Sequence, residues 1–370
     1  MRIRALLLLV CVSGPRAIGA QVVPATVART GVFFESYSFG TGLAFNRLSE
    51  MTVPITVTHH FGSRVTVDVG TAFASASVSH TGGATLDHSG FVDTDIRATV
   101  AVVPGRLLFN VVGTLPTGAT AVPDTTIPLF GATATDLLGF TTPTFGSGGG
   151  VSAGFASAFK LGQRWAAGTG ASYRYGASYT PVENGTDLVP GGEVRVRVGV
   201  EGPFGGGKYF RGAFVYTTTG ANDLGNGKRS LIGDRALLYA AMSAPLGRGS
   251  LSLYGWEMRR FDVGTTDTLV VPVPRGNVLA LGVRYEHALS PKTTLVPLLE
   301  VRHELTGTDS TTSLTLLGYL LRTGTDFRYR LSERALLVVQ AQVAFGRLHD
   351  EDQDVSLVGP RLGAFIEWSR

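Results

Sequence analysis

The stretch Glu193-Val194-Arg195-Val196-Arg197-Val198-Gly199-Val200 decides the fold, because a valine stands at every second position. A period of two is typical of a β-strand, whose successive side chains point to opposite faces. Here one face is apolar and the other carries charge. The same alternation recurs at Asp93–Val100 and at Val296–Glu304, so the sequence predicts a repeated, two-faced strand.

Tight turns that end in a basic residue separate these strands at intervals of 40 to 58 residues. They are Gly62-Ser63-Arg64, Pro104-Gly105-Arg106, Gly162-Gln163-Arg164, Gly206-Gly207-Lys208, Leu246-Gly247-Arg248, Pro291-Lys292 and Ser332-Glu333-Arg334. Seven longer polar connections alternate with them, the longest at Thr117–Phe145. Short turns at one end and long loops at the other are typical of an outer-membrane barrel.

The fold class that we predict is all-β: a transmembrane, antiparallel, up-and-down β-barrel. An eighth short connection, near Asn46–Ser49, brings the count to about 16 strands, or 14 if the first pair lies outside the wall. The closing stretch, Leu362–Trp368, has apolar residues at every second position and resembles the C-terminal signal strand of outer-membrane proteins. Residues 362, 364, 366 and 368 are expected to face lipid.

Composition agrees with this interpretation. The 370 residues include 49 Gly, and only 16% are charged, against roughly 25% in soluble domains. The net charge of +4 is spread along the chain, which argues against a nucleic-acid partner. No later stretch has about 18 apolar residues without a charge, so no transmembrane helix is expected.

The N-terminus has the pattern of a secretory signal. Arg2 and Arg4 precede an apolar run at Ala5–Val12, and small residues lead to a cleavage site near Ala20–Gln21. Cys11 raises the alternative of a lipid anchor, although the bulky Val10 before it disfavours that. We therefore predict a cleaved signal peptide at 1–20 and a barrel at 21–370, located in the outer membrane of a Gram-negative type of envelope.

Strand parity assigns a set of charged and polar side chains to the lumen, since charge facing hydrocarbon costs about 2–4 kcal/mol for an arginine at the midplane. The set is Asp93, Asp95, Arg97, Arg174, Glu193, Arg195, Arg197, Glu201, Arg211, Glu257, Arg259, Arg284, Glu286, Glu300, Arg302, Glu304, Asp326, Arg328, Arg330, Gln340 and Gln342. Three roles stay open for it: a self-neutralising ladder, a charge-selecting constriction, or a specific ligand site.

Two familiar chemical motifs are incomplete. Gly202-Pro203-Phe204-Gly205-Gly206-Gly207-Lys208 fits the start of a phosphate-binding loop, but Tyr209 replaces the Ser or Thr that holds magnesium and a strand follows. His59 and His60 are adjacent on a strand, so they point to opposite faces and cannot easily share a metal. We predict no enzyme activity, no catalytic or metal-binding residues and no cofactor.

Two stretches carry a family resemblance. Gly90-Phe91-Val92-Asp93-Thr94-Asp95 leads to Leu115-Pro116-Thr117-Gly118, and Phe145-Gly146-Ser147-Gly148-Gly149-Gly150 follows the long loop. This order resembles the outer-membrane channels associated with phenol-degradation (meta-pathway) operons, which are related to long-chain fatty-acid transporter barrels. The resemblance implies a porin-like channel.

The expected function is passive passage of small molecules, apolar or aromatic ones among them. The partners would be outer-membrane lipid, the solute and the assembly machinery of the outer membrane. Thr117–Phe145 holds two apolar runs, Ile127–Phe130 and Leu137–Phe140, which either fold inward and narrow the channel or pack on a neighbouring loop. The alternatives are a structural or surface-interaction barrel with a plugged lumen and, third, a barrel enzyme.

Overall fold

A computed structural model describes residues 24–142, 144–225, 227–263, 269–307, 314–350 and 353–370. The predicted signal peptide, residues 1–20, lies outside the described residues.

The described residues form twenty strands and two short helices. The strands are β1 (Thr26–Phe39), β2 (Phe45–Phe61), β3 (Val65–His80), β4 (Thr85–Phe91), β5 (Thr94–Val103), β6 (Leu107–Leu115), β7 (Gly150–Leu161), β8 (Trp165–Gly176), β9 (Glu193–Pro203), β10 (Tyr209–Thr219), β11 (Asn222–Asp223), β12 (Arg229–Leu231), β13 (Arg235–Leu246), β14 (Gly249–Arg260), β15 (Val270–Pro272), β16 (Arg275–Ala288), β17 (Thr293–Gly307), β18 (Thr315–Arg330), β19 (Ala335–Asp350) and β20 (Gln353–Ser369). The helices are η1 (Asp124–Thr126) and α1 (Ile127–Thr133).

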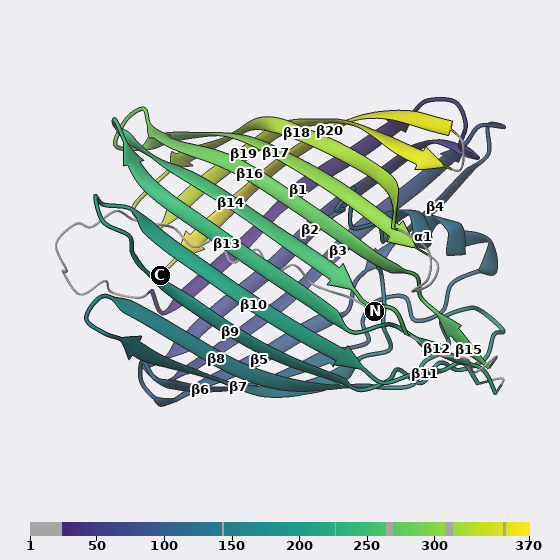
Figure 1. Cartoon of the computed structure of the whole chain (residues 1–370), viewed down its shortest axis with the longest axis horizontal. Coiled ribbons are helices and arrows are strands. Elements are labelled where there is room, and N and C mark those ends of the chain that lie inside the picture. The colour runs from purple at the N-terminus through teal and green to yellow at the C-terminus, as the bar shows by residue number, and fades with distance from the viewer. Residues whose placement is uncertain (1–23, 143, 226, 264–268, 308–313, 351–352) are drawn as a thin grey trace.

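Seventeen of these strands form one antiparallel sheet that closes on itself, since β1 pairs with both β2 and β20 (Figure 1). Both β4 and β5 pair with β3, at its two ends, so together they make one strand of the wall. The result is a closed barrel of sixteen strands, as the hairpin rhythm predicts. No helix among the described residues is long and apolar enough to cross a membrane.

The predicted connection near Asn46–Ser49 is wrong, because those residues lie inside β2. The chain turns instead at residues 40–44, between β1 and β2, at the end of the barrel opposite to the seven short turns. In a closed barrel with an even number of strands, both chain ends lie at the same rim. The opposite rim therefore has one connection more, and the turn at residues 40–44 is that additional connection. Thr26 and Arg370 indeed bond to each other's backbone.

Strand alternation gives the barrel an apolar outer face. Val194, Val196 and Val198 on β9 are each more than 40% exposed, although they are aliphatic. On the closing strand, Leu362, Ile366 and Trp368 share that face, as predicted. An exposed apolar band around a closed sheet suits a wall surrounded by lipid.

The phosphate-loop-like stretch Gly202–Lys208 joins β9 to β10 as a strand turn. The lysine backbone NH donates to the carbonyl of Gly205, and no helix follows. This stretch therefore serves as one of the short turns.

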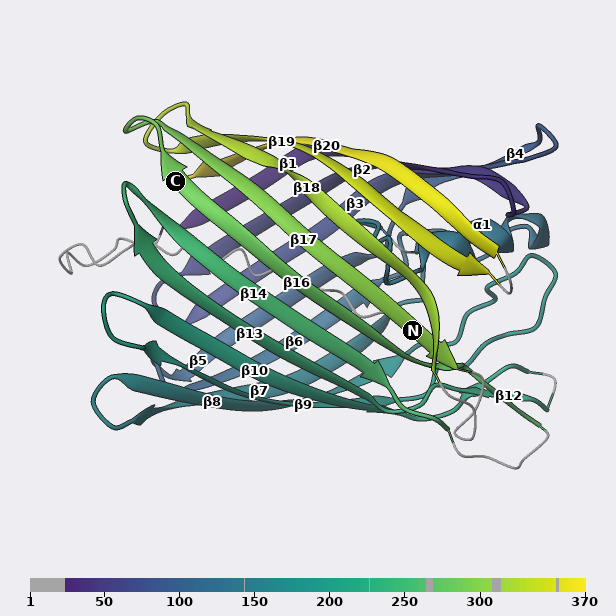
Figure 2. The same ribbon diagram turned by 45° about the horizontal axis from the view of Figure 1, so that its top comes forward.

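Residues 116–149, between β6 and β7, form what we call the lumen segment. It carries η1 and α1, and Figures 1 and 2 place α1 at the same end of the barrel as β4 and β12. Leu129, Leu137 and Phe145 in this segment are almost completely buried. They pack against inner-face residues of the wall, including Ala74, Ala76 and Val78 of β3, Leu48 of β2 and Leu320 of β18. Of the two placements that the sequence leaves open, the segment adopts the inward one.

We expect the purified protein to migrate differently in gel electrophoresis before and after boiling. A closed ladder of strands has no free edge from which to unfold, so detergent alone should leave the barrel compact. The comparison of boiled and unboiled samples checks this, and a heat-treated aliquot that has been refolded serves as the control. Identical migration of both samples would contradict a closed barrel.

Candidate functional site in the barrel lumen

The two ends of the lumen segment, next to β6 and β7, both contact Asp93. This residue lies in the interruption between β4 and β5. This carboxylate is completely buried. Its Oδ1 accepts from the backbone NH of Gly118 at 3.2 Å, and its Oδ2 accepts from Ser147 Oγ at 2.6 Å. One aspartate thus holds both ends of the segment together.

Glycines are required where the two ends of the segment meet. A Cβ on Gly118 would lie 1.9 Å from the carbonyl oxygen of Phe145. A Cβ on Gly146 would lie 1.9 Å from the carbonyl oxygen of Ala119. The motifs that carried the family resemblance therefore meet at this one place, where two backbones pass too closely for any side chain.

Aromatic rings line the outer part of the segment. His88 of β4 makes edge contacts with Phe130 and Phe145, with ring centroids 5.3 and 4.7 Å apart, and the two phenylalanines are 5.5 Å from each other. Deeper in, Phe140 packs edge-on against Tyr37 of β1 at 5.3 Å. Phe140 and Phe145 are almost completely buried in these contacts, whereas Phe130 stays partly exposed.

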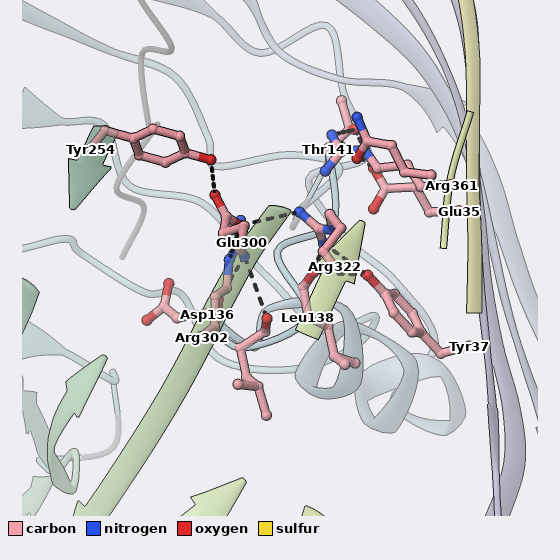
Figure 3. A network of polar contacts seen from close by, with 12 residues as sticks. Glu35, Tyr37, Asp136, Leu138, Thr141, Tyr254, Glu300, Arg302, Arg322 and Arg361 are labelled. Carbon is pink, nitrogen blue, oxygen red and sulfur yellow. Dashed lines mark hydrogen bonds and ion pairs between the residues drawn. The ribbon is translucent and has the colours of Figure 1, made fainter. Parts of the chain in front are cut away.

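The turn at residues 136–139 is tied to the wall by its carbonyl groups. Tyr37 Oη and Arg322 Nη2 donate to the carbonyl of Leu138, at 3.1 and 3.0 Å. Arg302 Nη1 donates to the carbonyls of Asp136 and Leu137, at 3.3 and 3.4 Å. Figure 3 shows this turn between β1 on one side and β17 and β18 on the other.

Glu300 joins the two arginines that bind this turn. Its Oε1 accepts from Arg302 Nε at 2.8 Å and lies 3.7 Å from Arg322 Nη1. Its Oε2 accepts from Tyr254 Oη at 2.7 Å (Figure 3). Because all four groups are held by one another, the arginines keep a fixed position against the segment.

Two carboxylates, Glu35 of β1 and Glu50 of β2, hold the residues that follow this turn. Glu35 Oε1 accepts from Thr141 Oγ1 at 2.7 Å and pairs with Arg361 at 3.2 Å. Glu50, directly opposite Glu35 in the β1–β2 ladder, accepts from the backbone NH of Thr142 at 2.8 Å. The segment is therefore attached to the wall by a few polar contacts on each side.

The strand register places most of the predicted set on the inner face. These residues are Asp95, Arg97, Arg174, Glu193, Arg195, Arg197, Glu201, Arg211, Arg284, Glu286, Glu300, Arg302, Glu304, Asp326, Arg328, Arg330, Gln340 and Gln342. Asp93 lies between two strands and is buried against the lumen segment. Within this set, ion pairs join Glu193 to Arg195 (2.8 Å), Glu201 to Arg211 (2.8 Å) and Glu286 to Arg328 (3.4 Å).

The prediction that Glu257 and Arg259 face the lumen is wrong. The register of β14 turns Trp256, Met258 and Arg260 inward and leaves Glu257 and Arg259 on the face of Leu253. Glu257 accepts from Asn277 Nδ2 at 2.9 Å, and Arg259 lies over the ring of Phe261 at 5.4 Å. Both residues are close to the end of the strand, where charge reaches headgroups and water and costs far less than at the midplane.

Sequence reasoning missed the wall residues that hold the segment: Glu35, Tyr37, Glu50, Arg322 and Arg361. A signal existed for Arg322, which has the parity of Asp326 and Arg328 on the same strand. Glu35 and Glu50 stand alone among apolar and hydroxyl side chains, so nothing local distinguished them.

The described residues contain no group of three or more His, Cys, Asp or Glu side chains placed to hold a metal. His59 and His60 fall on opposite faces: His59 contacts the ring of Phe61, and His60 bonds to Thr66.

Solved structures share the fold. A bacterial polysaccharide outer membrane secretin aligns with a TM-score of 0.50 and 8% identity, covering 94% of this chain and 99% of that one. The chain has the fold of an outer-membrane β-barrel. The CymD monoaromatic hydrocarbon channel aligns with a TM-score of 0.42 and 12% identity, covering 95% of this chain and 90% of that one. A mutant of the TodX monoaromatic hydrocarbon channel aligns with a TM-score of 0.44 and 10% identity, covering 94% of this chain and 90% of that one.

No protein-family model matches the chain, and no curated protein matches it either. At identities of 8 to 12% the likeness to the solved barrels concerns the fold alone. With the orientation typical of outer-membrane barrels, the rim with the short turns faces the periplasm and the lumen segment lies at the outer end.

Proposed function

We propose that this chain is a passive outer-membrane channel for small molecules, in which the lumen segment forms the constriction. The observation that carries the proposal is the segment's position inside the barrel, against the inner faces of β1, β3 and β18. A barrel of sixteen strands is wide enough to leave an aqueous passage. A segment inserted into it narrows that passage, and its apolar and polar contacts with the wall hold it in place.

Small apolar and aromatic molecules are among the solutes that we propose. The partly exposed rings of His88 and Phe130 provide ring edges and faces at the outer end, which suit aromatic solutes. The resemblance of the Gly90–Asp95 and Phe145–Gly150 stretches to channels of phenol-degradation operons supports the same class. We propose no catalytic activity and no cofactor, and assembly machinery of the outer membrane as a partner.

Reconstituted protein should make liposomes swell in small neutral solutes, at a rate that falls steeply as solute size increases. The physical reason is passage through a constriction of fixed width. Protein-free liposomes are the control, and single-channel conductance in planar bilayers gives an independent measurement. Swelling and conductance indistinguishable from the control would favour the alternative, a structural barrel with a plugged lumen.

A further inference from the structure

Burial removes carboxylates from the inner face of the wall more than it removes arginines. The buried carboxylates, each at most 7% exposed, are Glu35, Glu50, Glu193, Glu300, Glu304 and Asp326. The inner-face arginines that stay partly or fully exposed include Arg97, Arg174, Arg195, Arg197, Arg211 and Arg284. The surface that a solute meets inside the barrel is therefore more positive than the composition of the wall.

The lumen segment accounts for part of this difference. Glu35 and Glu50 lie beneath it, where they accept hydrogen bonds from Thr141 and from the backbone of Thr142. The apolar core under the segment takes its described wall residues from β1–β4 and β18–β20. The segment thus covers an acidic part of the wall, and the described residues of β8 and β9 take no part in that core.

The inner-face carboxylates that stay accessible are held by neighbours. Their partners are Arg211 for Glu201, Arg328 for Glu286, Arg29 for Glu367, Thr58 for Asp68 and Thr114 for Asp95. Asp68 also stands directly opposite Arg97 in the β3–β5 ladder, so Arg97 has a counter-charge beside it.

One carboxylate serves four arginines on β8, β9 and β13. Glu193 stands directly opposite Arg174 in the ladder, but its Oε1 pairs with Arg195 at 2.8 Å and its Oε2 with Arg235 at 3.0 Å. Among the residues that the structure describes, neither Arg174 nor Arg197 has a carboxylate oxygen within 4.0 Å. This part of the inner face therefore has an excess of positive charge.

The inner-face residues beside these arginines are small. Gly170 is the ladder partner of Arg197, and a Cβ on it would lie 3.0 Å from Arg197 Nε. Ser152 stands opposite Arg174. No bulky side chain at these two positions covers the guanidinium groups, and Arg197 is exposed.

We propose that the accessible inner face, with Arg174, Arg195 and Arg197 at its centre, makes the barrel select small anions, organic carboxylates among them, over cations. Arginines that line a water-filled passage attract anions and repel cations as they pass. The inference rests on the proposed channel function and names the charge class of its solutes.

The test uses the full-length barrel in planar bilayers of uncharged phosphatidylcholine. A gradient of potassium chloride across the bilayer produces a reversal potential, whose sign and size give the ratio of chloride to potassium permeability. Potassium benzoate in place of potassium chloride gives the same ratio for an aromatic carboxylate. Heat-modified migration confirms that each variant has folded.

We expect chloride to pass more readily than potassium, and the preference to weaken as the salt concentration rises on both sides, because salt screens charge. Arg197→Gln should lower both anion-to-potassium ratios about twofold, since it removes one unit charge near the path of the ions. The matched control is Arg259→Gln, which removes the same charge from the outer face of β14 and should keep the parental ratios.

The deletion of residues 120–141 tests the part played by the segment. It uncovers Glu35 and Glu50 and leaves the wall arginines in place, so the chloride-to-potassium ratio should fall. Glu35→Gln together with Glu50→Gln in the deletion protein should restore part of that ratio, which a wider lumen alone does not predict.

A parent that conducts without preferring chloride would overturn this inference and leave the channel function standing, whereas a parent that does not conduct would refute both. Parental ratios in Arg197→Gln, or an equal loss in Arg259→Gln, would also overturn it. If Arg197→Gln fails to fold, Arg174→Gln removes a neighbouring unpaired charge and gives the same test.

Discussion

Deleting residues 120–141 should leave a folded barrel whose single-channel conductance is several-fold higher than that of the parent. The wall closes without this stretch, because β6 pairs directly with β7 from Leu107 with Ser157 to Thr114 with Gly150. The deletion shortens a connection, and the entropy of closing a loop changes by only about 0.6 kcal/mol for each doubling of its length. What is removed is the part of the segment that fills the lumen.

Conductance in planar bilayers and heat-modified migration, measured on the same preparation, check this expectation. A deletion of residues 183–187, in the connection between β8 and β9, is the matched control and should keep the parental conductance. If the 120–141 deletion folds and conducts like the parent, the segment is no constriction. If it fails to fold, the segment is needed to build the wall.

Val196→Arg should reduce insertion into membranes strongly, whereas the neighbouring Arg197→Val should be tolerated. Val196 lies on the outer face of β9, opposite Ala171 and Tyr216, and is 43% exposed. An arginine there meets hydrocarbon and costs about 2–4 kcal/mol near the midplane. Arg197 points into the lumen, where Arg97 and Arg195 act on it as like charges, so its loss relieves repulsion.

The fraction of folded, heat-modifiable protein after insertion into lipid vesicles measures both variants. The pair is its own control, since the two residues are adjacent and differ in the face they occupy. Equal losses in the two variants, or a larger loss for Arg197→Val, would contradict the assignment of faces on β9.

The parity rule worked on most strands and was wrong near one strand end, on β14. On β9 and β17 the alternation of valine or leucine with charge assigns the faces correctly. On β14 the charge of Glu257 and Arg259 predicts an inward face, although Leu251 and Leu253 share their parity and face outward. Near the rim, polarity no longer distinguishes the two faces, because water reaches both.

The sequence alone determined the closed barrel, a count of about 16 strands and the faces of most of them, because a strand's side-chain direction is a local property of its backbone. Only the tertiary structure decided how the lumen is filled. Tyr37, Leu138 and Arg322, which meet in one hydrogen-bonded group, are 101 and 184 residues apart along the chain. Asp93 likewise meets Gly118 and Ser147 across 25 and 54 residues. The contacts of Asp93 exist only after the lumen segment has folded back on the wall. The meeting of Tyr37 with Arg322 needs β1 to pair with β20, since closure is what brings β1 close to β18.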